Sequence, residues 1–91
     1  MDDLTGFQRD LLYVIAGADQ PSGQTIKEEI ETYYSGEINH GRLYPNLDTL
    51  VNKEFVEKGQ LDRRTNYYAL ADTGDEAIRD RREWEAEYID H

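Results

Sequence analysis

Residues 39–53 constrain the fold more than any other stretch, because they combine an apolar stripe with a polar one. Apolar residues recur there at positions i, i+4, i+7 and i+8, the spacing of one face of an α-helix. They are Leu43, Leu47, Leu50 and Val51. Such a stripe must be buried, so the sequence predicts a helix that packs its apolar side against a core.

A polar stripe runs through the same stretch at nearly the same spacing. It consists of Arg42, Asn46, Thr49 and Lys53. None of these residues is acidic, although the chain has 20 acids and only 10 bases. Their donors and acceptors suit a nucleic-acid surface, but a solvated helix face has the same pattern. Both interpretations stay open from this stretch alone.

Pro45 limits where this helix begins. Proline has no N–H and its ring crowds the carbonyl four residues earlier, so it is tolerated best in or near the first turn. We therefore expect the regular helix to begin near Gly41 or Arg42, after an irregular or capping lead-in at residues 39–41. The first turn then lies at the exposed end, with which a recognition helix touches base edges.

Two helices are predicted before this one. The first covers residues 4–18, has a wide apolar face, and begins with a capping box formed by Thr5 and Gln8. The second begins at residue 24 or 25, where Thr25 and Glu28 match a second box. Its buried side is expected to comprise Ile26, Ile30, Tyr33 and Tyr34.

The connection between the second and third helices is short. Gly36 suits a left-handed backbone conformation and is expected to end the second helix. Ile38 is expected to be a buried anchor in the turn. Two helices joined by so short a turn, the second with two unlike faces, match a helix-turn-helix.

A β-hairpin is predicted after the third helix. Residues 55–61 and 67–70 are expected to be strands, with residues 62–66 as the turn. Arg63 and Arg64 lie at or beside its tip. A hairpin directly after a helix-turn-helix is a wing, and these arginines are predicted to contact phosphate or enter the minor groove. Pairing with the chain's abundant acids is the alternative.

The last helix is predicted to start at a third capping box, Thr73 with Glu76, and to run to about residue 88. One side has the 4-3-4 spacing of a coiled-coil seam, formed by Ala77, Arg81, Trp84 and Tyr88. The three-helix core is closed before this point, so Trp84 and Tyr88 are predicted to contact a second subunit. The alternative is that they fold back on the first helix.

The net charge of the whole chain argues against DNA binding, but the charge of one segment does not. A net charge of −10 over 91 residues repels a polyanion. Residues 39–66, however, hold five bases and four acids. Lysine is scarce, which is typical of adaptation to high internal salt. There the Debye length falls to about 3 Å near 1 M salt, and net charge acts weakly at a distance.

The composition excludes several classes of protein. The absence of cysteine excludes disulfides and thiolate metal sites, and His40 and His91 form no metal-ligand pattern. No apolar run approaches the roughly 20 residues of a membrane span, and the N-terminus does not resemble a signal peptide. No catalytic triad or phosphate-binding glycine loop is present. We expect a cytoplasmic non-enzyme without cofactor or metal, with one domain over residues 1–91.

Residues 41–50, continuing through residues 55–57, resemble the PadR family of winged-helix transcriptional regulators. In that family a Gly-x-Leu-Tyr-Pro-x-Leu-x-x-Leu run forms the recognition helix. Residues 64–74 are similar to the family's basic wing strand with its Tyr-Tyr-x-Leu-Thr pattern, although Ala71 stands where Thr is common. The resemblance covers roughly residues 7–80.

The resemblance implies a mainly α winged helix-turn-helix with a small β-hairpin, a three-helix core and a C-terminal dimerisation helix over residues 71–91. It also implies a homodimer that binds palindromic double-stranded operator DNA, most often as a repressor. Short family members dimerise through the terminal and first helices. Some relatives bind phenolic or drug-like effectors at the dimer interface, but nothing in this sequence indicates one. The alternative function is a winged helix that binds protein and not DNA.

The expected DNA contacts differ in chemistry. Arg42 suits guanine and Asn46 suits adenine, and at least one of them is predicted to read a base, with a phosphate contact or solvent exposure as the alternative. By resemblance to the family, Tyr44 touches phosphate, with packing against the core as the alternative, and His40 either caps the helix or contacts phosphate. The remaining predicted DNA contacts are Thr25, Lys27, Thr49, Lys53, Arg63, Arg64, Thr65 and Asn66. The predicted dimer interface consists of Leu4, Phe7, Leu11, Ile78, Arg81, Trp84 and Tyr88.

Overall fold

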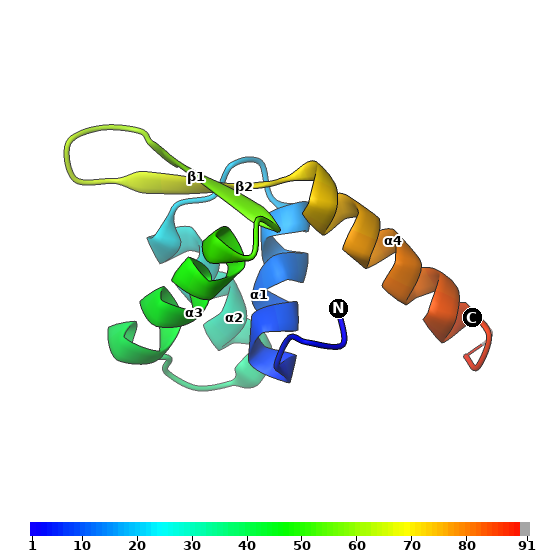
Figure 1. Cartoon of the computed structure of the whole chain (residues 1–91). Helices are drawn as coiled ribbons and strands as arrows, with labels where there is room; N and C mark the ends of the chain where they lie inside the picture. The colour runs from blue at the N-terminus through cyan, green and yellow to red at the C-terminus, as the bar shows by residue number, and fades with distance from the viewer. Residues whose placement is uncertain (90–91) are drawn as a thin grey trace.

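The chain folds into three helices, a two-stranded antiparallel hairpin and a fourth helix (Figure 1). The computed structural model describes residues 1–89, so the last two residues of the predicted dimerisation segment lie outside it. The elements are α1 (Gly6–Gly17), α2 (Gly23–Tyr34), α3 (His40–Asn52), β1 (Val56–Gln60), β2 (Asn66–Leu70) and α4 (Asp72–Ala86). The predicted mainly α architecture with a small hairpin is confirmed. Within residues 1–89, no helix is long and apolar enough to cross a membrane.

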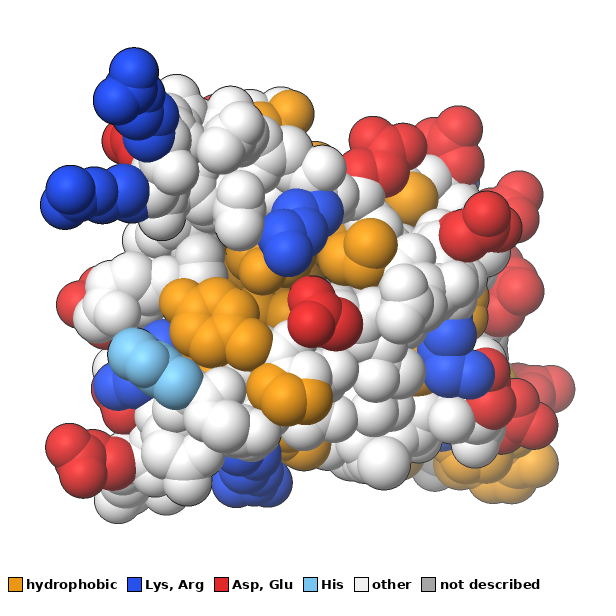
Figure 2. All heavy atoms as spheres, turned by 60° about the vertical axis from the view of Figure 1, so that its left-hand side comes forward, with side chains coloured by type: hydrophobic (Ala, Val, Ile, Leu, Met, Phe, Trp, Pro, Cys, Tyr) orange, Lys and Arg blue, Asp and Glu red, His pale blue; other side chains and the backbone are white. Residues whose placement is uncertain are grey.

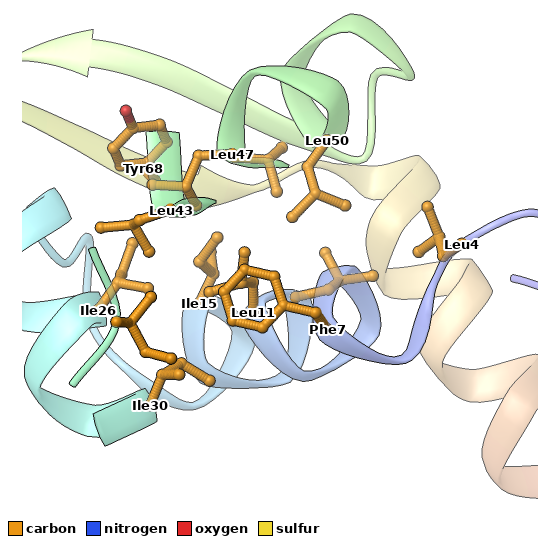
Figure 3. Close-up of a cluster of buried hydrophobic side chains, with 13 residues drawn as sticks. Leu4, Phe7, Leu11, Ile15, Ile26, Ile30, Leu43, Leu47, Leu50 and Tyr68 are labelled. Carbon is orange, nitrogen blue, oxygen red and sulfur yellow. The ribbon is translucent and has the colours of Figure 1, made fainter. Parts of the chain in front are cut away.

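The apolar stripe of α3 is buried as predicted. Leu43, Leu47 and Leu50 are fully enclosed, whereas Val51 at the edge of the stripe is half-buried. The three leucines point toward α1 (Figure 3). Their neighbours in the core include Leu11, Leu12, Ile15, Ile26, Ile30, Val56 and Tyr68. One side of α3 is therefore fixed by the core, and the opposite side stays open.

A hydroxyl caps both α1 and α2, but only α1 has the reciprocal bond of a complete capping box. The Thr5–Gln8 box is confirmed, because the Thr5 hydroxyl accepts from the Gln8 N–H at 3.1 Å and the Gln8 side chain accepts from the Thr5 N–H at 3.1 Å. The Thr25–Glu28 box is wrong. At α2 the Ser22 hydroxyl accepts from the Thr25 N–H, since the helix begins two residues before Thr25.

Two further helix ends differ from the predictions. The Thr73–Glu76 box is wrong because α4 already begins at residue 72, and its cap, Ala71, makes no side-chain hydrogen bond. The left-handed residue at the end of α2 is Ser35, with φ of 58°, and not Gly36.

The apolar side of α2 is narrower than predicted. Ile26 and Ile30 are buried, and Tyr34 is half-buried. The Tyr34 hydroxyl donates to Asp10 Oδ2 at 2.6 Å. Tyr33 is 78% exposed, because successive residues of a helix differ by about 100° and only one of the two tyrosines can face α1.

Helix α3 begins one or two residues earlier than predicted, at His40. Asn39 forms the expected cap, with its Oδ1 accepting from the Arg42 N–H at 2.8 Å. Pro45 consequently lies in the second turn and not the first. Its missing N–H leaves the carbonyl of Gly41 without the usual helical partner, on a side of α3 that solvent reaches.

The hairpin is bonded to the start of α2 as well as packed on α3. Its two strands match the predicted ranges, residues 55–61 and 67–70, to within one residue. The Tyr68 N–H donates to the Pro21 carbonyl oxygen at 2.9 Å, just before α2 begins. This bond positions the wing beside the N-terminus of α2.

The fourth helix, α4, projects from the body at the end opposite the wing (Figure 1). Ile78 packs against the core, but Trp84 is 50% and Tyr88 is 73% exposed. The alternative that these aromatics fold back on α1 is therefore wrong. Three apolar residues expected at a dimer interface are instead buried within the chain, because they belong to its hydrophobic core. They are Leu4, Phe7 and Leu11.

Candidate nucleic-acid interface

The outward side of α3 carries a different set of residues from the predicted polar stripe. Each residue turns an α-helix by about 100°, so the buried leucines fix which residues lie opposite them. Those residues, all exposed, are Gly41, Pro45, Asp48 and Asn52. The set contains an acid and no base, so electrostatic attraction to a polyanion must come from other elements.

The predicted polar stripe lies on the flank of α3 that faces α1. The Arg42 guanidinium sits 4.0 Å from the centre of the Phe7 ring. Lys53 pairs with Asp3 at 2.9 Å, and this hydrogen bond lowers the pKa of Asp3. Arg42 is exposed as predicted, whereas Asn46 is only half-exposed, and neither lies on the side opposite the buried leucines. Their spacing places the stripe about a quarter turn from the buried leucines and not opposite them.

Gln8 of α1 holds Asn46 in place, a role that sequence reasoning missed. Gln8 Nε2 donates to Asn46 Oδ1 at 2.9 Å, and Asn46 Nδ2 donates to the Arg42 carbonyl oxygen at 2.7 Å. Because Gln8 Oε1 accepts from the Thr5 N–H, the capping box fixes the direction of both amides. A glutamine buried in the otherwise apolar face of α1 is the signal that could have identified this contact.

Tyr44 covers the start of α2. Its ring packs so closely over Gly23 that a Cβ there would lie 2.6 Å from the Tyr44 hydroxyl oxygen. The His40 ring meets the Tyr44 ring edge-on, with centroids 5.5 Å apart. Tyr44 therefore packs on the start of α2, but it is 36% exposed and is not part of the core against which packing was predicted. The Thr49 hydroxyl donates within α3, to the Pro45 carbonyl oxygen at 3.0 Å.

A cavity of about 290 Å³ lies where α2, α3 and the wing meet. It is lined by Ser22, Gly23, Gln24, Tyr44, Arg64, Thr65, Asn66 and Tyr68. The first N–H groups of a helix carry partial positive charge, and Arg64 adds a full charge beside them. The structure thus brings together four of the predicted contacts, from Tyr44 to Asn66, around a cavity suited to an anion.

The two predicted contacts that belong to α2, Thr25 and Lys27, do not line this cavity. Thr25 belongs to the cap of α2, and Lys27 pairs with Glu31 at 2.8 Å. That hydrogen bond raises the pKa of Lys27 and lowers the pKa of Glu31. Glu31 Oε2 also accepts from the Ile38 N–H at 2.9 Å. Lys27 therefore helps to hold the turn between α2 and α3, where Ile38 is buried as predicted.

The tip of the wing presents two exposed arginines. Arg63 and Arg64 form no ion pair with any residue in the range 1–89, so the predicted alternative of pairing within the chain is not observed there. Asp62 Oδ1 accepts from the Arg64 and Thr65 N–H groups at 2.9 Å each. The hydrogen bond from Arg64 is the main reason that the pKa of Asp62 is lowered. The turn is therefore ordered by an acid beside the two bases.

Charge is unevenly distributed over this side of the molecule. Figure 2 shows Asp and Glu side chains crowding one edge, whereas the opposite edge carries extended Lys and Arg side chains together with some Asp and Glu side chains. The uneven charge along the sequence is thus also an uneven charge over the surface.

The sequence matches the transcriptional regulator PadR-like family over residues 11–80, which is most of the chain. The chain belongs to this PadR-like family. It is therefore a DNA-binding transcriptional regulator and not an enzyme.

Solved structures share the fold of this PadR-like protein. The hsRosR-SG complex structure is 50% identical with a TM-score of 0.92, covering 99% of this chain and 80% of that chain. The structure of H. salinarum RosR grown from NaBr has 51% sequence identity and a TM-score of 0.90. The match covers 98% of this chain and 81% of that chain. A winged-helix DNA-binding protein from STIV, F93, has only 20% sequence identity and a TM-score of 0.68. That match covers 93% of this chain and 91% of that chain, and shows a shared fold. No curated protein matches the sequence.

The α4 side of this PadR-like protein offers a second surface, with aromatic and not basic character. The Trp84 and Tyr88 rings lie 5.3 Å apart, and the Arg81 guanidinium lies 4.7 Å from the Trp84 ring centre. A cavity of about 420 Å³ runs between α1 and α4. It is lined by Tyr13, Ala16, Gly17, Ile78, Arg82 and Glu85.

Proposed function

We propose that this PadR-like protein is a homodimeric repressor that binds a palindromic DNA operator. The observation that carries the proposal is the cavity shared by α2, α3 and the wing, with the arginines of the wing tip beside it. A DNA-binding protein needs cationic groups that fix its register on the phosphates and a helix side open to base edges. Both requirements fit this side of the molecule.

In this proposal α3 lies in the major groove with its outward side toward the base edges. The small side chains of Gly41 and Pro45 allow a close approach. A backbone phosphate occupies the cavity, held by Arg64, by the N–H groups that open α2, and by the Tyr44 hydroxyl. Arg63 reaches the neighbouring backbone or the minor groove.

The flank of α3 contributes backbone contacts in the proposal. Arg42 can leave the Phe7 ring at small cost, because an exposed cation–π contact is worth about 0.5–1 kcal/mol. Asn46 is less free to pair with adenine, since Gln8 and the Arg42 carbonyl already engage its amide. The other proposed contacts to phosphate or sugar are Thr25, Lys27, His40, Thr49, Lys53, Thr65 and Asn66.

The proposed dimer forms through α4. Two exposed aromatic rings on one helix are unusual for a small monomer, and aromatic residues are enriched at interfaces. Ile78, Arg81, Trp84 and Tyr88 remain the proposed contact residues. The recognition helices of the two subunits would lie about 34 Å apart, which is one turn of DNA. The buried residues of α1 contribute only by supporting α4.

The proposed setting is a cytoplasm of high salt, in which the chain acts as one domain. Repression then follows from occupying the operator. No effector is proposed, because nothing in the sequence indicates one.

Selection of bound fragments from random duplex DNA, at low and at molar salt, tests the proposal. We expect a palindromic motif at both salt concentrations, with half-sites about one helical turn apart. Enrichment of no sequence at either salt would reject operator binding and favour a winged helix that binds protein. A motif without two-fold symmetry would reject the dimer while keeping the DNA contact.

A further inference from the structure

Asp48 occupies the middle of the outward side of α3, where an acid is unexpected. It is the sole acid in that helix, and its side chain is 57% exposed. Each neighbouring position on the same side, Pro45 and Asn52, is uncharged. A carboxylate facing DNA opposes the phosphate attraction that drives binding. Its presence there calls for a favourable interaction that the rest of the chain does not supply.

The carboxylate is compensated in charge but is not hydrogen-bonded by its neighbour. Lys58 Nζ of β1 lies 3.8 Å from Asp48 Oδ1, which is too long for a hydrogen bond. An ion pair this exposed contributes little to stability, so stability does not explain the acid. Lys58 nevertheless offsets the repulsion from nearby phosphates. Asp48 therefore presents oxygen lone pairs outward with part of its charge already balanced.

An ionised carboxylate only accepts hydrogen bonds. In the major groove, guanine presents acceptors and thymine an acceptor and a methyl group, whereas cytosine N4 and adenine N6 are donors. Adenine also places its N7 acceptor beside N6, which a carboxylate would face unfavourably. Cytosine offers the donor without that neighbour on the same base, and aspartate pairs with cytosine N4 in known readout chemistry.

We propose that Asp48 determines specificity, by accepting a hydrogen bond from cytosine N4 at one position of each half-site. This inference rests on the proposed location of α3 in the major groove. Lys58 acts as a positioning residue, because its positive charge reduces the repulsion between the Asp48 carboxylate and the DNA phosphates. Asp48 then rejects guanine and thymine at that position by facing their acceptors.

Selection from random duplex DNA, repeated with Asp48→Ala and Asp48→Asn, tests the inference. The parent should require cytosine at one column of each half-site. Asp48→Ala should reduce the preference at that column by about tenfold or more and keep the rest of the motif. Asp48→Asn should shift the column toward adenine, which asparagine pairs through N6 and N7. Circular dichroism checks that each variant folds.

Glu57→Ala is the matched control, since it removes one exposed acid from β1 and none from α3. It should keep the full motif while binding all DNA slightly more tightly. An unchanged motif in Asp48→Ala would overturn the inference and leave the proposed function standing. Loss of the whole motif in a folded Asp48→Ala protein would also overturn it, because a single base contact cannot carry every column. A parent without any motif would reject the proposed function, and the inference with it.

Discussion

The flank of α3 and the tip of the wing carry similar polar side chains but differ in what those side chains already contact. On the flank, Arg42 stacks on a phenylalanine, Asn46 is bonded to α1, and Lys53 is paired with an acid. At the wing tip, Arg63 and Arg64 have no ion-pair partner within residues 1–89. The difference shows that a polar stripe along a helix can serve internal packing, whereas an ordered turn can leave its bases available to a partner.

The largest expected effect is on stability and concerns the buried side of α3, which anchors this helix to the core. Leu47→Ala should lower the free energy of unfolding by about 2–5 kcal/mol, because it removes a fully buried side chain. Urea denaturation measures the change. A loss below about 0.5 kcal/mol, the size of an ordinary surface substitution, would show that the inner side of α3 is misassigned.

The wing should matter for binding and not for folding. Arg63→Ala combined with Arg64→Ala should weaken binding to the selected operator roughly a hundredfold, since two charge-assisted hydrogen bonds contribute about 3 kcal/mol together. The melting temperature should stay unchanged. A variant that bound operator as tightly as the parent, in a fluorescence anisotropy titration, would remove the wing from the interface.

The aromatic residues of α4 are expected to contact the second subunit, whereas the wing is expected to contact DNA. Trp84→Ala should weaken the proposed dimer by about 2 kcal/mol or more, as expected for a central aromatic residue of an interface. Sedimentation should then detect monomer at micromolar concentrations. Tyr33→Ala, at an exposed tyrosine of α2, is the control and should not change the sedimentation profile.

Substitutions that disturb the flank of α3 should lower stability, whereas those in the wing should lower DNA affinity. Gln8→Ala should cost about 1–3 kcal/mol of unfolding free energy, because it removes a buried amide that caps α1 and bonds to Asn46. Gln8→Glu separates the two roles. It keeps the cap but turns the donor facing Asn46 Oδ1 into an acceptor, so a loss of stability in Gln8→Glu would identify the contact with α3.

The smallest expected effect is the pH dependence of the wing turn. The pKa of Asp62 is lowered below its ordinary value of 3.8, so its contribution is complete above pH 3.8 and is lost as the pH falls through the lower folded-state pKa. NMR signals of the Arg64 and Thr65 amides should shift in that range. Asp62→Asn should abolish the pH dependence but keep the turn, and persistence of the shifts in that variant would assign them to another acid.

The sequence predicted the parts of the fold that depend on local spacing. The stripe of Leu43, Leu47 and Leu50, the Thr5–Gln8 box and the wing all follow from residues close together in the chain. Contacts across long separations were not visible, as for Gln8 with Asn46, 38 residues apart. Such a contact depends on how two helices cross, which residue spacing along one helix does not determine.

The candidate site was predicted in part for the same reason. The wing and Tyr44 could be identified from their order along the chain, but their meeting with the start of α2 depends on the hydrogen bond between the hairpin and residue 21. The outward side of α3 could have been derived by placing the residues opposite the buried leucines. A prediction based only on the absence of acids identifies the polar stripe on the flank instead.

The most direct test of the account is an NMR titration of the protein with the selected operator, following the amide signals of each element. The largest changes are expected at Gly23, Gln24, Gly41, Asp48 and Arg64, with the side-chain amides of Gln8 and Asn46 retaining their hydrogen-bonded signals. Changes confined to α4, with these five amides unaffected, would contradict the assignment of the DNA-binding surface.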